Sequence, residues 1–287
     1  MFKRQEVKRS EGIILGGLGL LVVLSLFVSV PDGQLHVWFL DVGQGDAIFM
    51  RTPSGRQILV DGGPDRTILR RLGEVMPFYD RTIDVIIATH PDADHLAGLV
   101  EVLEKYRVGQ IIETGLECAT ALCAEWERIK PKERAVVTYA KLGEEVEMSD
   151  GVRLLILHPF VELVNQHLSL RNNGAVVAKL LYGEQSLLLT ADIEAIVEKK
   201  LLLSRLNLDV DFLKVAHHGS KTSTTEEFLK AVTPQVAFIQ VGEKNRYGHP
   251  TAEVLSRLEN FRIPYYRTDT AGTIELVLDG KNYLIKH

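Results

Sequence analysis

The densest group of possible metal ligands in this sequence is the run Thr89-His90-Pro91-Asp92-Ala93-Asp94-His95. It follows the apolar stretch IDVIIA and precedes the amphipathic stretch LAGLVEVLEKY, so it forms a loop between a strand and a helix. Active sites of α/β proteins collect at such strand ends. Helix capping by Asp94 explains one acid, but not two histidines and two aspartates together. Imidazole and carboxylate ligands suit divalent ions such as Zn²⁺ or Mn²⁺, so the run predicts a metal site.

Two later strand ends offer further ligands. Asp192 follows the apolar run LLLT, and His217 and His218 follow DFLKVA and precede Gly219. Four ligands from one loop cannot all reach one tetrahedral ion without strain. We therefore expect two ions that share the first loop and take more ligands from these turns. Taken alone, Asp192 is equally well explained as a helix N-cap, whereas paired histidines at a strand end have no obvious packing role.

Six motifs in chain order carry a resemblance to a known family. They are FLDVGQGDA (39–47), LVDGG (59–63), HPDADH (90–95), LLTADIE (188–194), LKVAHHGSKTS (213–223) and NRYGHP (245–250). The third resembles the H-x-H-x-D-H signature of metallo-β-lactamase-fold hydrolases. The whole series resembles the extracytoplasmic hydrolase domain of the ComEC competence protein family. The resemblance implies an α/β fold, a four-layer αββα metallo-β-lactamase-like sandwich.

The resemblance also implies roles for individual residues. His90 and Asp92 would hold one ion, Asp94, His95 and His217 the other, and Asp192 would bridge them. Asp94 would also orient the attacking water. His218 and His249 are expected to donate a proton to the leaving oxygen or to contact the phosphoryl oxygens. Residues expected to contact the substrate are Asn173, Ser220, Lys221 and Ser223. For Asn173 and Lys221, a plain turn remains the alternative.

Three departures from the family pattern matter. Asp92 stands where the family signature has its second histidine, which tilts the site towards Mn²⁺ or Mg²⁺ over Zn²⁺. The family's separate histidine ligand has only a weak candidate here, His158 in an HPF turn. ComEC proteins carry a multi-helix channel, whereas this sequence has one apolar run of membrane-spanning length, so channel function does not carry over. Asp41 and Asp46 are expected to brace loops instead of binding metal.

The N-terminal segment has the pattern of a membrane-targeting sequence. Residues 12–30 form an uncharged apolar run after the basic segment 1–11, and such a run is just long enough to cross a bilayer. We expect a signal anchor, with residues 1–11 cytoplasmic and a hydrolase domain, 32–287, outside. A cleaved signal peptide and a buried core helix are the alternatives. Outside the cytoplasm Cys118 and Cys123 could form a disulfide, but a regular helix would separate them, and the question stays open.

Apolar periodicity predicts the elements of the body. Strands are expected over 35–40, 47–50, 57–61, 83–89, 109–113, 152–157, 176–182, 186–190, 212–216, 236–241 and 273–278. Helices are expected over 66–75, 95–106, 119–129, 193–203, 224–231 and 252–260. Short strands with surface helices suggest two sheets packed face to face. No linker divides the body, so we expect one domain.

These observations favour a membrane-anchored, metal-dependent phosphodiesterase outside the cytoplasm, a nuclease that degrades DNA. The net charge of −5 argues against binding nucleic acid through bulk positive charge, although bound cations offset part of it locally. A metallohydrolase of small phosphate esters, phosphocholine esters or lactones is the first alternative. A non-catalytic binding or scaffold protein with a decayed site is the second, and the intact His/Asp set argues against it.

Overall fold

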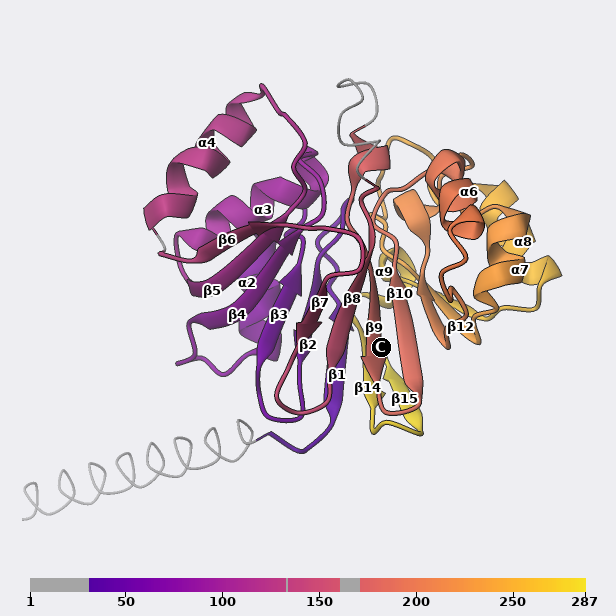
Figure 1. Cartoon of the computed structure of the whole chain (residues 1–287), viewed down its shortest axis with the longest axis horizontal. Helices are drawn as coiled ribbons and strands as arrows, with labels where there is room; N and C mark the ends of the chain where they lie inside the picture. The colour runs from indigo at the N-terminus through magenta and orange to yellow at the C-terminus, as the bar shows by residue number, and fades with distance from the viewer. Residues whose placement is uncertain (1–30, 133, 161–170) are drawn as a thin grey trace, which may run out of the picture.

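The protein is a sandwich of two β-sheets with helices on both outer faces (Figure 1). The structure is a computed structural model that describes residues 31–132, 134–160 and 171–287. The first sheet has the order β15-β14-β1-β2-β3-β4-β5-β6 and the second the order β13-β12-β11-β10-β9-β8-β7. Helices α2, α3 and α4 lie on one side of the molecule, and α6, α7 and α8 lie on the other (Figure 1). The expected αββα arrangement is confirmed.

The elements have the following bounds. The strands are β1 Leu35–Phe39, β2 Ile48–Arg51, β3 Gln57–Val60, β4 Thr82–Ala88, β5 Arg107–Glu113, β6 Val136–Tyr139, β7 Glu145–Glu147, β8 Arg153–His158, β9 Val177–Tyr182, β10 Gln185–Leu189, β11 Phe212–Lys214, β12 Val236–Ile239, β13 Tyr265–Arg267, β14 Ile274–Leu278 and β15 Tyr283–Lys286. The α-helices are α2 Thr67–Val75, α3 Ala93–Leu103, α4 Ala121–Ile129, α6 Ala195–Leu203, α7 Glu226–Val232, α8 Ala252–Asn260 and α9 Thr268–Ala271.

Three apolar layers hold the sandwich together. Central strands bury both faces, because one face meets the other sheet and the opposite face meets helices. In β3, Ile58 and Val60 belong to the core between the sheets, whereas Leu59 packs in the core beneath α2 and α3. A third core fills the space between the second sheet and its helices. This alternation is the period of two that a strand imposes on its side chains.

Parallel strand pairs bring the chemically active loops to one edge. Strand β4 is parallel to β3 and β5, and β11 is parallel to β10 and β12. The loops after β4, β10 and β11 therefore leave from the carboxyl ends of their strands. The amide of Val176, just before β9, donates a hydrogen bond to the carbonyl of Thr89 at 2.9 Å, so the two sheets are joined beside the His90 loop.

Helix α3 approaches the turn after β3 unusually closely. A Cβ atom built on Gly98 would lie 1.8 Å from the carbonyl oxygen of Gly62, which leaves no room for a side chain. The amide of Gly62 donates to the carbonyl of His95 at 2.8 Å. The glycines of LVDGG and α3 therefore fix the first turn of α3, which carries Asp94 and His95, against the first sheet.

All eleven expected strands and all six expected helices are present. Four further strands, β6, β7, β13 and β15, were not expected, and neither was the four-residue helix α9. The disulfide that the sequence left open is present between Cys118 and Cys123, with Cα atoms 5.9 Å apart. It forms because Cys118 lies before the helix, whose N-cap is Thr120.

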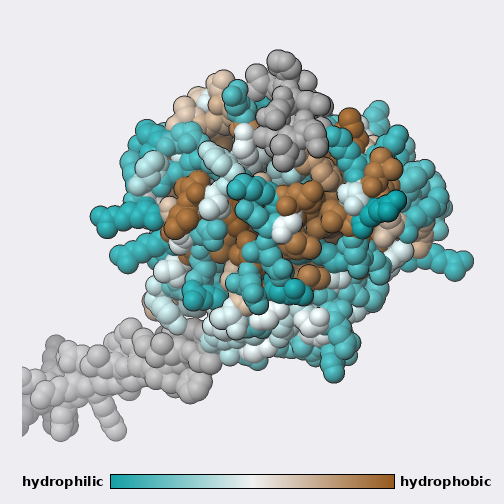
Figure 2. All heavy atoms as spheres, viewed as in Figure 1, coloured by the Kyte–Doolittle hydropathy of each residue, from teal (hydrophilic) through white to brown (hydrophobic). Residues whose placement is uncertain are grey.

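The expected membrane anchor over 12–30 lies outside the described residues. Within residues 31–132, 134–160 and 171–287, no helix is both long enough and apolar enough to cross a membrane. Figure 2 shows hydrophobic residues grouped across the middle of one face, over β6 and towards β7 and β8. Strand β6 contributes to this group, since its Val136 and Val137 are 62% and 41% exposed.

Candidate metal centre

Three of the predicted ligands converge with His218, which was expected to contact the phosphoryl group, where the two sheets meet. Asp94, His95, Asp192 and His218 each offer one ligand atom, and these atoms all lie within 4.8 Å of one another. The Nε2 atoms of His95 and His218 each lie 3.3 Å from Oδ2 of Asp192. His218 Nε2 is also 3.4 Å from Oδ2 of Asp94. The loop after β4 and the turns after β10 and β11 therefore meet at one point, although β4 belongs to a different sheet from β10 and β11.

His90 extends this cluster on one side. Its ring lies 4.1 Å from the ring of His95, measured between centroids, and it forms a second candidate group with His95 and Asp61. Its Nε2 atom is 3.9 Å from Oδ2 of Asp92. Asp92 is half-exposed and also accepts a hydrogen bond from Arg171 at 3.2 Å. The geometry allows two neighbouring cation positions, one beside His90 and one between His95 and His218.

Each of the three buried imidazoles is held by its Nδ1 atom. His95 Nδ1 lies 2.8 Å from the Asp61 carboxylate, His218 Nδ1 lies 2.9 Å from the carbonyl of Gln240, and His90 Nδ1 lies 3.0 Å from Oγ1 of Thr89. An acceptor at Nδ1 places the proton there and leaves the lone pair on Nε2. This arrangement is typical of metal-ligating histidines, whose second nitrogen is fixed by a carboxylate or carbonyl.

The atoms left without partners fit a cation. Among the described residues, the buried Nε2 atoms of His90, His95 and His218 and the Oδ1 atom of Asp192 have no hydrogen-bond partner. Buried polar atoms are normally satisfied, so several unpartnered atoms on neighbouring side chains need a common explanation. Nitrogen and carboxylate oxygen donors together match Zn²⁺ and Mn²⁺ chemistry. The residues present therefore fit a divalent-metal centre.

The backbone around the cluster is strained. Asp61, Ala191, His217 and His218 all have positive φ, between 46° and 57°. Non-glycine residues rarely adopt this left-handed region, and each such residue costs of order 1–3 kcal/mol. The strain turns the chain sharply after β3, β10 and β11, and it brings both histidines of the HHGS turn to face Asp192. Such strain is characteristic of functional sites.

Charge and burial set the protonation of the cluster. Burial, with help from nearby His95, lowers the pKa of His90 to about 3, so this imidazole is neutral and ready to bind a cation. Burial opposes the charged forms of His95 and His218, but Asp192, together with Asp61 beside His95 and Asp46 beside His218, outweighs it and holds both pKa values well above the usual range. His218 and His95 in turn outweigh burial and keep the pKa of Asp192 well below its usual range. Metal binding would displace these protons.

A buried lysine lies behind the cluster. Lys214 is fully buried, forms an ion pair with the buried carboxylate of Asp46, and donates to the carbonyl of Ala191 at 3.0 Å. Its Nζ atom is 3.8 Å from Oδ1 of Asp192. Asp46 also lies beside His218, with 3.3 Å between Oδ1 and Nδ1. These contacts agree with the expectation that Asp46 braces the site, and Asp41 likewise pairs with Arg71.

His217 and His249 lie at the rim of the cluster. The side chain of His217 is 21% exposed, and its Nε2 atom is 3.8 Å from Oδ2 of Asp192. The structure thus puts His218 in the inner position that the sequence assigned to His217. The ring of His249 is 5.7 Å from that of His217 and nearly perpendicular to it. Asp192 itself does not cap the next helix, because the N-cap of α6 is Glu194.

Most of the residues expected to contact the substrate are hydrogen-bonded to neighbouring loop residues. Asn173 is buried and exchanges two hydrogen bonds with Glu194, at 2.9 and 3.0 Å. Ser223 is buried and donates to the carbonyl of Ile193 at 2.8 Å. Ser220 lies 3.0 Å from the hydroxyl of Thr222, and Lys221 is exposed. Asn173 and Ser223 thus brace loops around Asp192, and a contact with substrate stays a prediction for all four.

His158 does not join the cluster. It is fully buried, its Nδ1 lies 2.9 Å from the carbonyl of Ala175, and it belongs to neither candidate group of ligands. A role as the missing ligand therefore has no geometric support.

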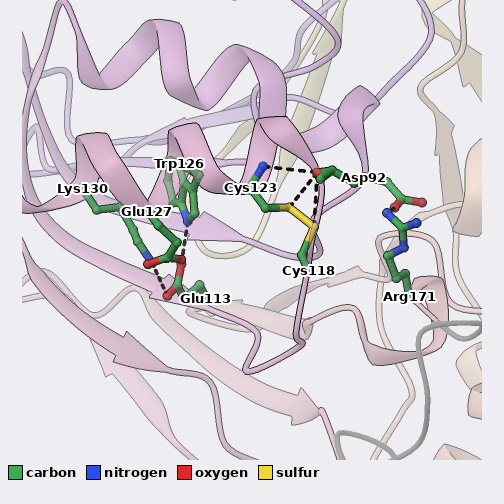
Figure 3. Close-up of a disulfide and its surroundings, with 9 residues drawn as sticks. Asp92, Glu113, Cys118, Cys123, Trp126, Glu127, Lys130 and Arg171 are labelled. Carbon is green, nitrogen blue, oxygen red and sulfur yellow. Dashed lines mark hydrogen bonds and ion pairs between the residues drawn. A yellow bond between two sulfur atoms is a disulfide. The ribbon is translucent and has the colours of Figure 1, made fainter.

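A cavity of about 220 Å³ borders His90. It is lined by the disulfide, by Trp126 and by Glu113. Figure 3 shows the disulfide between the Asp92–Arg171 ion pair and the Glu113–Lys130 contact. The Glu113 carboxylate is already occupied, because it accepts from Trp126 Nε1 and from Lys130 Nζ, each at 2.7 Å. The disulfide therefore forms part of a wall next to the His90 loop.

Sequence reasoning missed two residues that support the centre. Asp61 was noted only as part of LVDGG, and Lys214 only as part of the apolar strand before HHGS. An aspartate directly after a buried strand is a usable signal for Asp61. A single lysine inside an apolar run is the corresponding signal for Lys214, because a buried lysine needs a charged partner.

A sequence profile of the metallo-beta-lactamase superfamily matches residues 40–243, and the chain belongs to this superfamily. It is 29% identical to ComE operon protein 3 of Bacillus subtilis over an alignment 284 residues long, which covers 93% of this chain and 36% of that protein. It is 30% identical to Recombination protein 2 of Haemophilus influenzae over 271 residues, 93% of this chain and 31% of that protein. These are ComEC-family competence proteins, so the resemblance is confirmed.

The chain spans about a third of the length of these curated relatives. Among solved structures, Igni18, a metallo hydrolase from Ignicoccus hospitalis, aligns with a TM-score of 0.55 at 12% identity, covering 84% of this chain and 98% of that one. At this identity the alignment shows the shared fold alone. Family and ligand set together make this a metal-dependent hydrolase domain.

Proposed function

We propose that this chain is a two-metal phosphodiesterase that cleaves DNA. One observation carries the proposal: the unpartnered Nε2 atoms of His95 and His218 lie in one group with the carboxylates of Asp94 and Asp192, and the unpartnered Nε2 atom of His90 lies next to that group. Two divalent ions held by such a set would polarise a phosphate oxygen and lower the pKa of an attacking water. Because Asp92, Asp94 and Asp192 all contribute carboxylates, we propose Mn²⁺ or Mg²⁺ as the working ion, with Zn²⁺ as the alternative.

The distances support specific roles. Asp192 suits the role of a ligand of the second ion, since its Oδ2 atom lies 3.3 Å from the Nε2 atoms of both His95 and His218, and we propose that it also bridges to the first ion, as the family resemblance implies. We assign His218 to the second ion, and His217 remains a candidate ligand through its Nε2 atom, 3.8 Å from Asp192. The carboxylate of Asp94 is 31% exposed, so it can hold and orient a water molecule at the open side. His90 and Asp92 would hold the first ion.

His249 is suited to contacting the phosphoryl group. Burial, together with the neighbouring His218 and His217, lowers the pKa of His249 below its usual value. The imidazole is therefore neutral near pH 7 and offers one N–H donor. A neutral donor favours a hydrogen bond to a developing oxyanion over rapid proton delivery to the leaving group.

The choice of DNA rests on the relatives. Recombination protein 2 is named for recombination, and both reported relatives are ComEC-family competence proteins whose alignments cover 93% of this chain. The net charge of −5 opposes binding over a wide surface, so we propose that contact with the phosphate backbone is concentrated at the metal centre. Small phosphate esters, phosphocholine esters and lactones are the competing substrates.

The test uses the full chain purified in detergent and stripped of metal with a chelator. Mn²⁺, Mg²⁺ or Zn²⁺ is then restored over a panel of single-stranded DNA, double-stranded DNA, RNA, a phosphocholine ester and a lactone. Metal-dependent cleavage of DNA that disappears in His218→Ala supports the proposal, and this variant also excludes a contaminating nuclease. Turnover of the ester or lactone without DNA cleavage would replace it with the second function.

We also propose that residues 12–30 anchor the hydrolase domain, 32–287, outside the cytoplasmic membrane. The basic segment 1–11 favours this orientation. Protease added to intact spheroplasts should then degrade the domain while the protein stays in the membrane fraction. Recovery of a soluble extracellular form beginning near Pro31 would instead indicate a cleaved signal peptide.

A further inference from the structure

An exposed aromatic ring stands at the rim of the metal centre. Tyr247 is 53% exposed. Its ring stacks on that of His249, with centroids 5.8 Å apart and planes inclined by 24°. The ring of His249 is in turn 5.7 Å from that of His217. Tyr247 therefore places a half-exposed aromatic ring next to the candidate ligands, separated from them by only one or two imidazoles.

The loop that carries Tyr247 is rigidly built. The side chain of Asn245 accepts hydrogen bonds from the amides of Tyr247 and His249, at 3.2 and 2.9 Å. Its amide group donates to the carbonyls of Gly242 and His249, each at 2.8 Å. One asparagine thus ties both ends of the loop together, and Tyr247 has little freedom to fold back into the core.

The same loop is tied to the HHGS turn. The amide and hydroxyl of Thr251 both donate to the carbonyl of Gly219, at 3.0 and 3.1 Å. A Cβ atom on Gly219 would lie 2.5 Å from Cβ of Pro250, so the two turns touch directly. The position of Tyr247 is therefore fixed relative to His217 and His218, as a substrate contact requires.

Burial does not explain this arrangement. The ring of Tyr247 stays half in water, and its hydroxyl only accepts a hydrogen bond from the exposed Arg246 at 3.2 Å. The guanidinium of the exposed Arg246 lies over the ring, 5.2 Å from its centroid, so a stacking base would displace this side chain and leave its charge beside the phosphate. An aromatic face with an adjacent cation is the pattern that binds unpaired bases and their phosphates. Bases inside a duplex are already stacked on each other, so only a single strand gains from such a face.

We propose that Tyr247 is a stacking platform for an unpaired nucleobase beside the scissile phosphate. The proposal rests on the phosphodiesterase function proposed above. Arg246 contributes a charge for the flanking phosphate. Because base–aromatic stacking is worth about 1–3 kcal/mol per base, removing the ring should weaken binding by about 5- to 150-fold.

The test measures KM and kcat of the full chain with Mn²⁺ on a short oligothymidylate and on the same oligomer carrying one abasic site in turn at each position. Tyr247→Leu should raise KM for the intact oligomer by about 5- to 150-fold with a smaller effect on kcat. Tyr247→Phe should keep the low KM, because it keeps the ring. The difference in KM between Tyr247→Leu and the wild type should disappear on the oligomer that lacks the base expected to stack on the ring.

Tyr79→Leu is the matched control. Tyr79 is 51% exposed and precedes β4, at the opposite end of that strand from His90. The Tyr79→Leu variant should therefore have the same KM as the wild type. An unchanged KM in Tyr247→Leu, or a gap that persists on every abasic oligomer, would overturn the platform. If wild-type protein cleaves no phosphodiester, the proposed function fails. The platform is then judged by the anisotropy of labelled oligothymidylate bound to metal-free protein, where Tyr247→Leu must bind more weakly and equal affinity refutes it.

Discussion

Replacing Asp61 by asparagine tests whether a buried carboxylate sets the metal-binding face of His95. Asp61 is 1% exposed. Its Oδ2 atom accepts a hydrogen bond from the Thr89 hydroxyl at 2.7 Å and lies 2.8 Å from His95 Nδ1. Its Oδ1 atom accepts a hydrogen bond from the backbone amide of Thr89 at 2.8 Å. All three contacts need an acceptor. Asparagine offers only one, so its NH₂ group must face either the Thr89 amide or His95 Nδ1.

Both orientations carry a cost that can be estimated. If NH₂ faces His95, the imidazole must move its proton to Nε2, which removes the lone pair meant for the cation. Loss of such an outer contact costs about 10- to 100-fold in metal affinity, or about 1.4–2.7 kcal/mol. If NH₂ faces the Thr89 amide, a buried donor is left unsatisfied, at about 1–3 kcal/mol of unfolding free energy. We expect a mixture of the two losses.

The assay is competition for Mn²⁺ against a fluorescent chelator, together with urea unfolding of the metal-free protein. Asp65→Asn is the control, because Asp65 is exposed and its side chain accepts from the amide of Thr67 in a local turn. It should leave metal affinity unchanged. Asp61→Asn with wild-type affinity and wild-type stability would refute the reasoning. Lower stability with unchanged Mn²⁺ affinity would show that Asp61 has only a structural role.

Three further outcomes follow from buried groups. Lys214→Met should destabilise the fold by about 3–5 kcal/mol in urea unfolding, because it leaves the Asp46 carboxylate buried without its partner; adding Asp46→Asn should recover part of this loss. Burial lowers the pKa of His158 from 6.5 to about 4, so the unfolded chain binds this proton more readily than the folded protein. The resulting contribution of about 3 kcal/mol to the free energy of unfolding is complete above pH 6.5 and is lost as the pH falls towards 4. His158→Gln should flatten that part of the stability profile, and an equally steep profile would contradict the assignment. Mutating Cys118 and Cys123 to serine should lower the free energy of unfolding by roughly 2 kcal/mol, as expected for so short a loop. If the double variant also loses metal affinity, the disulfide shapes the His90 loop.

The strands that sequence patterns missed are the four edges of the two sheets. β6 and β15 end the first sheet, and β7 and β13 end the second. Edge strands have one unpaired side and little cover, so their residues do not show the apolar patterning of a buried strand. In β7 and β15 most side chains are exposed. Central strands such as β3, buried on both faces, were found because every residue in them is constrained.

The centre was predicted as a set of residues but not in its detail. Motif spacing identifies His90, His95 and Asp192, because strand ends and helix starts are visible in the pattern. It cannot decide between His217 and His218, since the left-handed backbone at both residues depends on contacts with other turns. Nor does it reveal that Asp61 holds His95, because that pair is joined only by the fold.

The central claim is that these residues hold two divalent ions with Asp192 between them. The most direct test is the metal content of the purified full chain, loaded with Mn²⁺ and measured by mass spectrometry, in the wild type and in Asp192→Asn. Asparagine preserves size, and a cooperative thermal melt verifies that the variant is folded. We predict two ions per chain in the wild type and loss of most bound metal in Asp192→Asn. Two ions per chain in the folded variant would contradict the account.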